Sequence, residues 1–214
     1  MGKRGSRDHI RREGSLRRRP GASRGRPVLL IVCEGETEQE YFEALKRKFR
    51  IRSTQVVVSD NLVGSSPISV VRCALSKYAD FPTYDHVYCV FDRDAHADFD
   101  RARQEIKRAS TRRRNPAPLR EAVSVPCVEL WFLLHKVYSA APYANFDAIR
   151  PVLRGHIPGY EKADRAIAEE LVQHVEVAIA NAERLVTAAN SDGFQNPYTT
   201  VHLLAKYIIS LSGV

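Results

Sequence analysis

The sequence has few cysteines and no long apolar run, and both absences narrow what the chain can be. Its four cysteines form no C-x-x-C pair, which argues against a zinc site or a redox motif and favours buried, reduced thiols. No stretch approaches the roughly 18 consecutive apolar residues that a membrane span needs, and the N-terminus lacks the apolar segment of a secretory signal. We therefore expect a cytoplasmic protein that does not enter a membrane.

Two further absences concern catalysis and architecture. The sequence contains no P-loop and no nucleophilic-lysine motif, which disfavours a ligase or nucleotidyl-transfer activity. It also contains no internal repeat. A length of 214 residues with 44% hydrophobic content fits one ordinary globular domain with an appendage.

The net charge of +8 is concentrated at one end of the chain. Residues 1–26 contain ten Lys or Arg and two acidic residues, so the rest of the chain is formally neutral. This segment is rich in Gly, Arg and Ser with almost no apolar content, and it is predicted to be a disordered basic arm. Such an arm either binds nucleic acid through its phosphates or is a solvated tail without a partner.

From residue 27 onward, strand-like and helix-like patterns alternate. Short apolar runs rich in β-branched residues predict strands at 27–33, 55–58, 86–91 and 122–125. Apolar residues at helical spacing predict helices at 37–50, 68–78, 97–109 and 128–137, with Thr37 and Glu40 as a capping box for the first. Beyond residue 140 only helices are predicted, at 146–153, 161–189 and 199–211.

This order of elements predicts an α/β fold with a mainly parallel sheet flanked by helices. We place the core at residues 27–140 and a helical C-terminal extension, packed on the core, at residues 141–214. The long helical pattern has Ala163, Ile167, Leu171, Val175 and Ile179 each four apart, which indicates a single amphipathic stripe.

Two of the predicted strands end in acidic residues. Glu34 and Glu38 follow the first strand, and Asp92 and Asp94 follow the third. Because the carboxyl ends of parallel strands meet at one edge of a sheet, we expect these carboxylates to gather there. Such a cluster needs a bound cation, a nearby Arg or Lys, or raised pKa values. The alternative is that these residues only cap helices or form turns.

Spacing predicts how these side chains point. Asp92 and Asp94 share one face if the extended conformation persists beyond the strand. Glu34 and Glu38 are four apart across a strand-to-helix turn, where Gly35 allows the backbone to bend closely. Carboxylate oxygens in this arrangement are the ligands that Mg²⁺ prefers. The sequence therefore predicts a site for Mg²⁺ or Mn²⁺.

Glu129 and several basic residues are further candidates. Glu129 begins an apolar helix just after the fourth strand, where it is either a partner of the helix dipole or a member of the site, and its burial would require a paired group. The candidate phosphate-binding residues are Arg93, Arg112, Arg113 and Arg114, although solvation alone explains a basic loop. The sequence does not decide whether three histidines contact substrate or have a structural or surface position: His96, His135 and His202. Trp131 and Phe132 are predicted to be core residues.

Four motifs together resemble the RloB family over about residues 28–210. They are Cys33-Glu-Gly-Glu-Thr-Glu-Gln-Glu-Tyr-Phe42, Phe91-Asp-Arg-Asp94, Ser124-Val-Pro-Cys-Val-Glu-Leu-Trp-Phe-Leu-Leu-His135 and Asn196-Pro-Tyr-Thr-Thr-Val-His202. The glutamate after the first strand and the Asp-x-Asp after the third also resemble the Toprim superfamily, which includes topoisomerases, primases and the overcoming-lysogenization-defect nucleases.

The resemblance implies a Toprim-like fold and a Mg²⁺-dependent nuclease linked to restriction and phage defence, often beside an ABC-type ATPase partner. It puts Glu34, Asp92 and Asp94 in the family's acidic positions, with Glu38 as a further metal ligand. We expect hydrolysis of RNA or DNA by Glu34, Glu38, Asp92, Asp94 and Glu129. The alternative is a non-catalytic regulatory or nucleic-acid-binding subunit that acts with the ATPase, and the sequence leaves the oligomeric state open.

Overall fold

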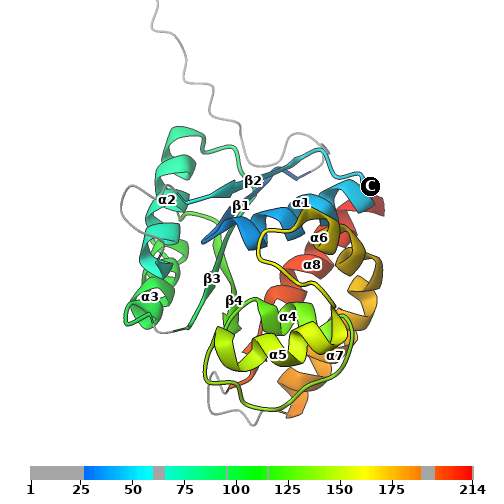
Figure 1. Cartoon of the computed structure of the whole chain (residues 1–214). Coiled ribbons are helices and arrows are strands. Elements are labelled where there is room, and N and C mark those ends of the chain that lie inside the picture. The colour runs from blue at the N-terminus through cyan, green and yellow to red at the C-terminus, as the bar shows by residue number, and fades with distance from the viewer. Residues whose placement is uncertain (1–26, 60–65, 95, 115, 189–195, 214) are drawn as a thin grey trace, which may run out of the picture.

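The computed structural model describes residues 27–59, 66–94, 96–114, 116–188 and 196–213 (Figure 1). The predicted basic arm, residues 1–26, lies outside the described residues. A five-stranded sheet has the order β2-β1-β3-β4-β5. Its strands are β1 (Leu29–Cys33), β2 (Thr54–Val58), β3 (His86–Asp92), β4 (Leu119–Val125) and β5 (Tyr198–Thr199). The predicted α/β fold with a mostly parallel sheet is thus confirmed.

The first four strands run parallel, and β5 runs antiparallel to β4. In the register, Leu29 lies opposite both Thr54 and His86. The four parallel strands therefore begin together at one edge, the amino edge, and end together at the other, the carboxyl edge. All five residues of β1 are buried, which explains its continuous apolar run, because helices cover both faces of this strand.

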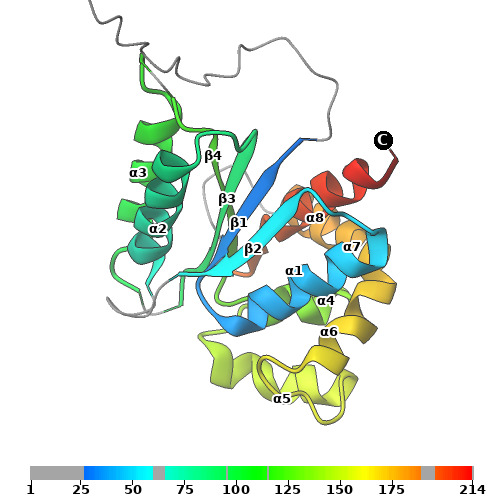
Figure 2. The same cartoon turned by 90° about the horizontal axis from the view of Figure 1, so that it is seen from above.

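Two helices cover one face of the sheet, at the left of Figure 1. They are α2 (Pro67–Asp80) and α3 (Phe99–Ser110), which pack against each other and against β3 and β4. Their apolar side chains meet those of the sheet in one buried cluster that includes Val70, Phe91 and Ile106. Each of these helices starts near the carboxyl edge and ends near the amino edge, as the turned view shows (Figure 2).

The remaining helices lie on the opposite face. They are α1 (Glu36–Phe49), α4 (Glu129–Leu134), α5 (Phe146–His156), α6 (Arg165–Leu171), α7 (Val175–Ala188) and α8 (Val201–Ser210), with short 3-10 turns at Val172–His174 and Leu211–Gly213. All six residues of α4 are buried, and α4 contacts α5 and α7. Side chains of α1, α4, α5, α7 and α8 share one apolar cluster with β1, so the C-terminal helices complete the core on this face.

The predicted single helix at 161–189 is wrong. Ala163 has φ of 57°, and Asp164 caps α6 by accepting hydrogen bonds from the amides of Ala166 (2.7 Å) and Ile167 (3.2 Å). A 3-10 turn then separates α6 from α7. The amphipathic stripe expected from Ala163 to Ile179 is therefore not one face of a single helix. Ala163 lies before Asp164, the N-cap of α6, and the 3-10 turn interrupts the rest.

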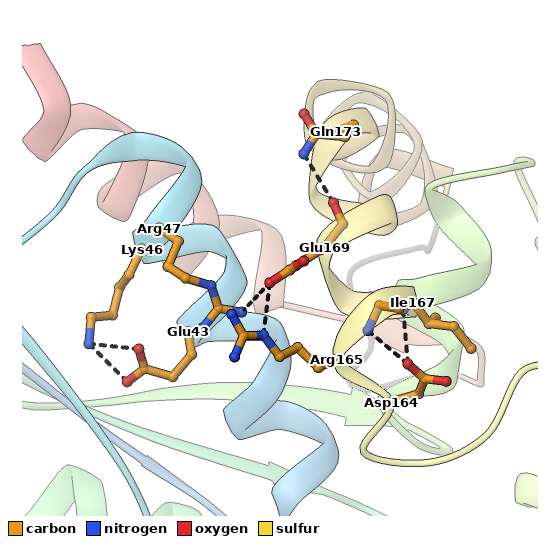
Figure 3. A network of polar contacts seen from close by, with 9 residues as sticks. Glu43, Lys46, Arg47, Asp164, Arg165, Ile167, Glu169 and Gln173 are labelled. Carbon is orange, nitrogen blue, oxygen red and sulfur yellow. Dashed lines mark hydrogen bonds and ion pairs between the residues drawn. The ribbon is translucent and has the colours of Figure 1, made fainter.

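The helix α6 lies against α1, where a surface network links the two (Figure 3). Glu169 accepts from Arg165 Nε at 2.9 Å and pairs with Arg47 of α1 at 3.2 Å. The capping box predicted for α1 is also wrong, because α1 begins after Gly35, which offers no side-chain cap. The Thr37 hydroxyl instead accepts from the Ala163 amide at 3.2 Å, so it holds the connection that leads into α6.

No helix among the described residues is long and apolar enough to cross a membrane. All four cysteines are free thiols, and three of them are buried. The three buried thiols agree with the prediction of buried, reduced cysteines.

Candidate carboxylate site at the carboxyl edge

The ends of β1 and β3 bring Glu34 and Asp92 together. The Asp92 amide donates to Glu34 Oε2 at 3.1 Å, and the Glu34 amide donates to the Val90 carbonyl at 3.0 Å. Asp92 Oδ2 in turn accepts from the Val128 amide at 2.9 Å, just past the end of β4. The prediction that these two carboxylates meet at one edge of the sheet is confirmed, and backbone amides fix the position of each.

Glu38 reaches the same place from the first turn of α1. Its side chain is buried, with 5% of the residue exposed. Gly35 has φ of −140°, a conformation open to any residue, so its role is not the sharp bend that the sequence suggested. A Cβ at position 35 would lie 3.3 Å from Glu38 Oε2, and a side chain there would crowd this buried carboxyl.

Glu129, at the start of α4, is almost completely buried, with 1% exposed. Its Oε1 accepts from the Tyr160 hydroxyl at 3.0 Å and lies 3.6 Å from Lys162 Nζ. The Lys162 ammonium also lies 4.1 Å from the centre of the Phe146 ring. The buried carboxylate of Glu129 therefore has the partners that its burial requires. Both partners, Tyr160 and Lys162, come from the C-terminal helical part.

Burial and mutual repulsion raise the pKa values of these acids. For Glu38 the pKa is raised to about 8, mainly by burial and then by the charges of Glu34 and Glu129. Burial, followed by Glu38, Glu129 and Glu34, raises the pKa of Asp92. Burial also raises the pKa of Glu34, against the lowering effects of the Asp92 amide and His96. We call Glu34, Glu38, Asp92 and Glu129 the carboxylate cluster, since the charges of Glu34 and Glu129 act on both Glu38 and Asp92.

Asp94 stands apart from this cluster. The strand ends at Asp92, and Asp94 lies in an exposed turn with φ of 30°, where its amide donates to the Pro126 carbonyl at 2.9 Å. The extended conformation does not persist, so the condition under which Asp92 and Asp94 would share a face is not met. Asp94 still acts on the cluster through its charge, which raises the pKa of Glu34.

The three histidines fall into two groups. His96 Nε2 lies 3.0 Å from Glu34 Oε1 and is partly exposed, so it borders the cluster. His135 is buried between the Trp131 carbonyl (2.8 Å) and the Tyr41 hydroxyl (3.0 Å), and burial lowers its pKa to about 3. His202 is buried as well, and its pKa is also lowered. Trp131 and Phe132 are core residues, as predicted.

The predicted phosphate-binding arginines lie at opposite edges of the sheet. Arg93 follows β3 at the carboxyl edge, with its guanidinium 6.0 Å from the centre of the Phe99 ring. Arg112, Arg113 and Arg114 are exposed and follow α3, whose 12 residues carry the chain about 18 Å away from the carboxyl edge. Of the four arginines, only Arg93 therefore adjoins the carboxylate cluster.

Sequence reasoning missed Tyr160 and Lys162. No motif marked them, because they come from the connection between α5 and α6, far from Glu129 in sequence. The only available signal was indirect: a buried Glu129 has to find a hydroxyl or a cation somewhere in the fold.

The cluster offers oxygen ligands of the type that Mg²⁺ and Mn²⁺ prefer. Among the residues that the structure describes, no set of three or more His, Cys, Asp or Glu side chains is arranged so that it could hold a metal ion. Mg²⁺ typically takes only one or two protein carboxylates and completes its shell with waters and substrate phosphates. The donor chemistry therefore fits a metal that a phosphate-bearing substrate helps to bind.

By its fold and site, the chain is an α/β protein of the class in which carboxylates gather where neighbouring parallel strands end. Within that class, the model of the RloB-like protein family matches residues 29–208, and the chain belongs to this family. Comparison with curated proteins and with solved structures gave no match.

Proposed function

We propose that this chain is a metal-dependent nuclease that hydrolyses phosphodiester bonds of RNA or DNA, as a cytoplasmic effector of phage defence with a Toprim-like fold. The observation that carries the proposal is the carboxylate cluster: four acids on three segments, in which burial and the charges of Glu34 and Glu129 raise the pKa values of Glu38 and Asp92. Purely structural acids are normally solvated, with an ordinary pKa, or paired with a cation, which lowers the pKa. Groups whose pKa values are raised by burial and by like charges are typical of functional sites.

Asp92 and Glu34 are the residues that would hold Mg²⁺ or Mn²⁺, because amide donors already fix one oxygen of each. When bound, the metal supplies Lewis acidity that polarises the phosphate and lowers the pKa of the attacking water. Glu38, with a pKa of about 8, keeps a proton on its carboxyl at neutral pH until a cation neutralises its neighbours. Asp94 adds negative charge at the exposed rim.

Glu129 is a positioning residue in this scheme. Its carboxylate is held by the Tyr160 hydroxyl and by Lys162, and its charge acts on both Glu38 and Asp92. The exposed part of Lys162 and Arg93 provide cationic groups near the carboxylates, and His96 borders them. We propose that these groups contact the phosphate of the substrate.

A second candidate function is a non-catalytic regulatory or nucleic-acid-binding subunit that acts with an ABC-type ATPase. One observation favours it: among the described residues, no three potential ligands are arranged to hold a metal ion. In that case the cluster would serve the structure alone, and metal would not change what the protein does.

The test is cleavage of single-stranded DNA, double-stranded DNA and total tRNA by the purified full chain with Mg²⁺ or Mn²⁺. Asp92→Asn keeps an oxygen for the Val128 amide but removes the charge, and we expect it to reduce cleavage about a hundredfold. The matched control is Asp147→Asn, since the Asp147 side chain is 76% exposed on α5, and it should cut as the wild type does. Thermal melting verifies that both variants are folded.

Equal cleavage by Asp92→Asn and wild type would overturn the assignment, as would wild-type cleavage that survives EDTA. Absence of cleavage of all three substrates with both metals would overturn the nuclease proposal in favour of the non-catalytic subunit.

A further inference from the structure

A pocket of about 290 Å³ lies at the amino edge, on the opposite side of the sheet from the carboxylate cluster. Its lining includes Val28, Arg52, Ser53, Thr54, Phe81 and Tyr84. These residues border the starts of β1, β2 and β3. Since β3 spans seven residues at about 3.3 Å each, the pocket is about 20 Å from the cluster, so neither site forms part of the other.

Two hydroxyl groups of this pocket lack hydrogen-bond partners. Among the described residues, Ser53 Oγ and Thr54 Oγ1 are buried without a donor or acceptor in reach, and Thr54 is only 5% exposed. Leaving a buried polar group unpaired destabilises a fold, so nearly all such groups find a partner. Both oxygens are closed off from the pocket surface, so recognition of a ligand there comes from the exposed groups of the lining.

An exposed aromatic ring and a cation border these hydroxyls. Phe81 is 64% exposed, the largest fraction of any large apolar side chain in the described part of the chain. Tyr84 lies beside it in the lining and donates its hydroxyl to Gln55 Oε1. Arg52 is exposed at the same pocket. An aromatic face beside a guanidinium is the combination with which proteins hold the bases and phosphates of single-stranded nucleic acid.

The arginines at 112–114 extend this surface. They follow the C-terminal end of α3, and Phe81 follows the C-terminal end of the adjacent helix α2 on the same face of the sheet. Both helices end toward the amino edge (Figure 2). The starts of β2 and β4 are three strand spacings apart, or about 14 Å, a distance that a few nucleotides span.

We propose that the amino edge binds single-stranded nucleic acid. One base stacks on Phe81, and Arg52 with Arg112–Arg114 holds the adjacent phosphates. A duplex offers no free base face to Phe81, so the surface selects single strands. This binding site goes beyond the proposed nuclease function and stands whether or not the chain cleaves its ligand.

The test uses the full chain in EDTA, so that the probe is not cleaved. The salt concentration is raised to weaken any binding that depends only on the charge of the nucleic-acid backbone. The probe is a single-stranded oligonucleotide that carries 2-aminopurine, whose fluorescence reports stacking. We expect Phe81→Ala to weaken binding about tenfold and to abolish the fluorescence change. The matched control is Leu203→Ala, because Leu203 is 52% exposed on α8, and it should bind as the wild type does.

A second variant, Arg52→Gln, separates charge from stacking. We expect it to weaken binding and to reduce the salt dependence while the fluorescence change at saturation persists. Unchanged affinity and fluorescence in Phe81→Ala would overturn the proposal. Equal competition by a duplex of the same sequence would also overturn it, because that result requires recognition of the backbone alone.

Discussion

Glu38 illustrates, at the scale of one residue, what the carboxylate cluster does to stability. Its pKa is raised to about 8 in the folded chain, whereas an unfolded Glu has a pKa of about 4.3. Between these values the unfolded state is ionised and the folded state holds the proton. Raising the pH through this window therefore favours unfolding, by up to about 1.4 kcal/mol per pH unit.

Glu38→Gln removes this ionisation while keeping the shape of the side chain. We expect the variant to melt at a higher temperature than wild type at pH 8.5, by about 2–4 °C for each kcal/mol regained, and at nearly the same temperature at about pH 4, below the pKa of the unfolded glutamate. Calorimetry at the two pH values measures the difference. The control is Glu36→Gln, an exposed acid in the same turn, and an equal gain at both pH values for Glu38→Gln would contradict the raised pKa.

The cluster also shows which site residues could be predicted from sequence. Glu34 and Asp92 could, because each directly follows an apolar run that becomes a parallel strand, and such strand ends meet. Tyr160 and Lys162 could not, since their contact with Glu129 depends on how the chain between α5 and α6 folds back over α4. The position of Asp94 could be predicted only on the condition that the strand continued past Asp92, because the backbone conformation after the strand decides where its side chain points.

At the scale of the element, strands were predicted well and helix boundaries less so. The four parallel strands stand within three residues of their predicted bounds, because burial on both faces produces an unbroken apolar run. The two-residue β5 had no such signal. The break between α6 and α7 at Val172–His174 was missed because apolar residues recur every fourth position across it. Periodicity also does not register the backbone turn at Ala163, which lies before the start of α6.

The cap at Asp164 stabilises the start of α6, which directly follows the connection that carries Tyr160 and Lys162. Asp164→Ala removes the acceptor for two amides of α6, and we expect a loss of about 1 kcal/mol in the free energy of unfolding. Urea denaturation measures this loss. Asp147→Ala is the matched control, because Asp147 lies in the first turn of α5 but Asn145 caps that helix. A loss for Asp164→Ala no larger than that of the control would show that the cap contributes nothing.

At the scale of the whole molecule, the sheet separates two kinds of chemistry. Acids gather where the parallel strands end, while Arg52 and the arginines at 112–114 lie where they begin. This separation could have been deduced from sequence, because a helix that follows a strand returns the chain to the opposite edge. Arg112–Arg114 lie away from the carboxylates because the 12 residues of α3 carry the chain back across the sheet.

Two distant sites should respond independently to substitution. We expect Asp92→Asn to bind the single-stranded probe in EDTA within about twofold of wild type, because the cluster lies about 20 Å from the pocket. The same fluorescence titration measures this affinity. A large loss of binding in Asp92→Asn would show instead that the two edges form one continuous surface.

The link between Glu129 and Lys162 has a consequence for how the protein is made. During translation, the strands that carry Glu34 and Asp92 leave the ribosome well before the segment with Tyr160 and Lys162, and domains generally fold from the N-terminus onward during synthesis. Until that later segment arrives, Glu129 has neither its hydroxyl nor its ammonium partner. The acidic centre is thus completed only when most of the polypeptide has been synthesised, which delays its assembly on a nascent chain.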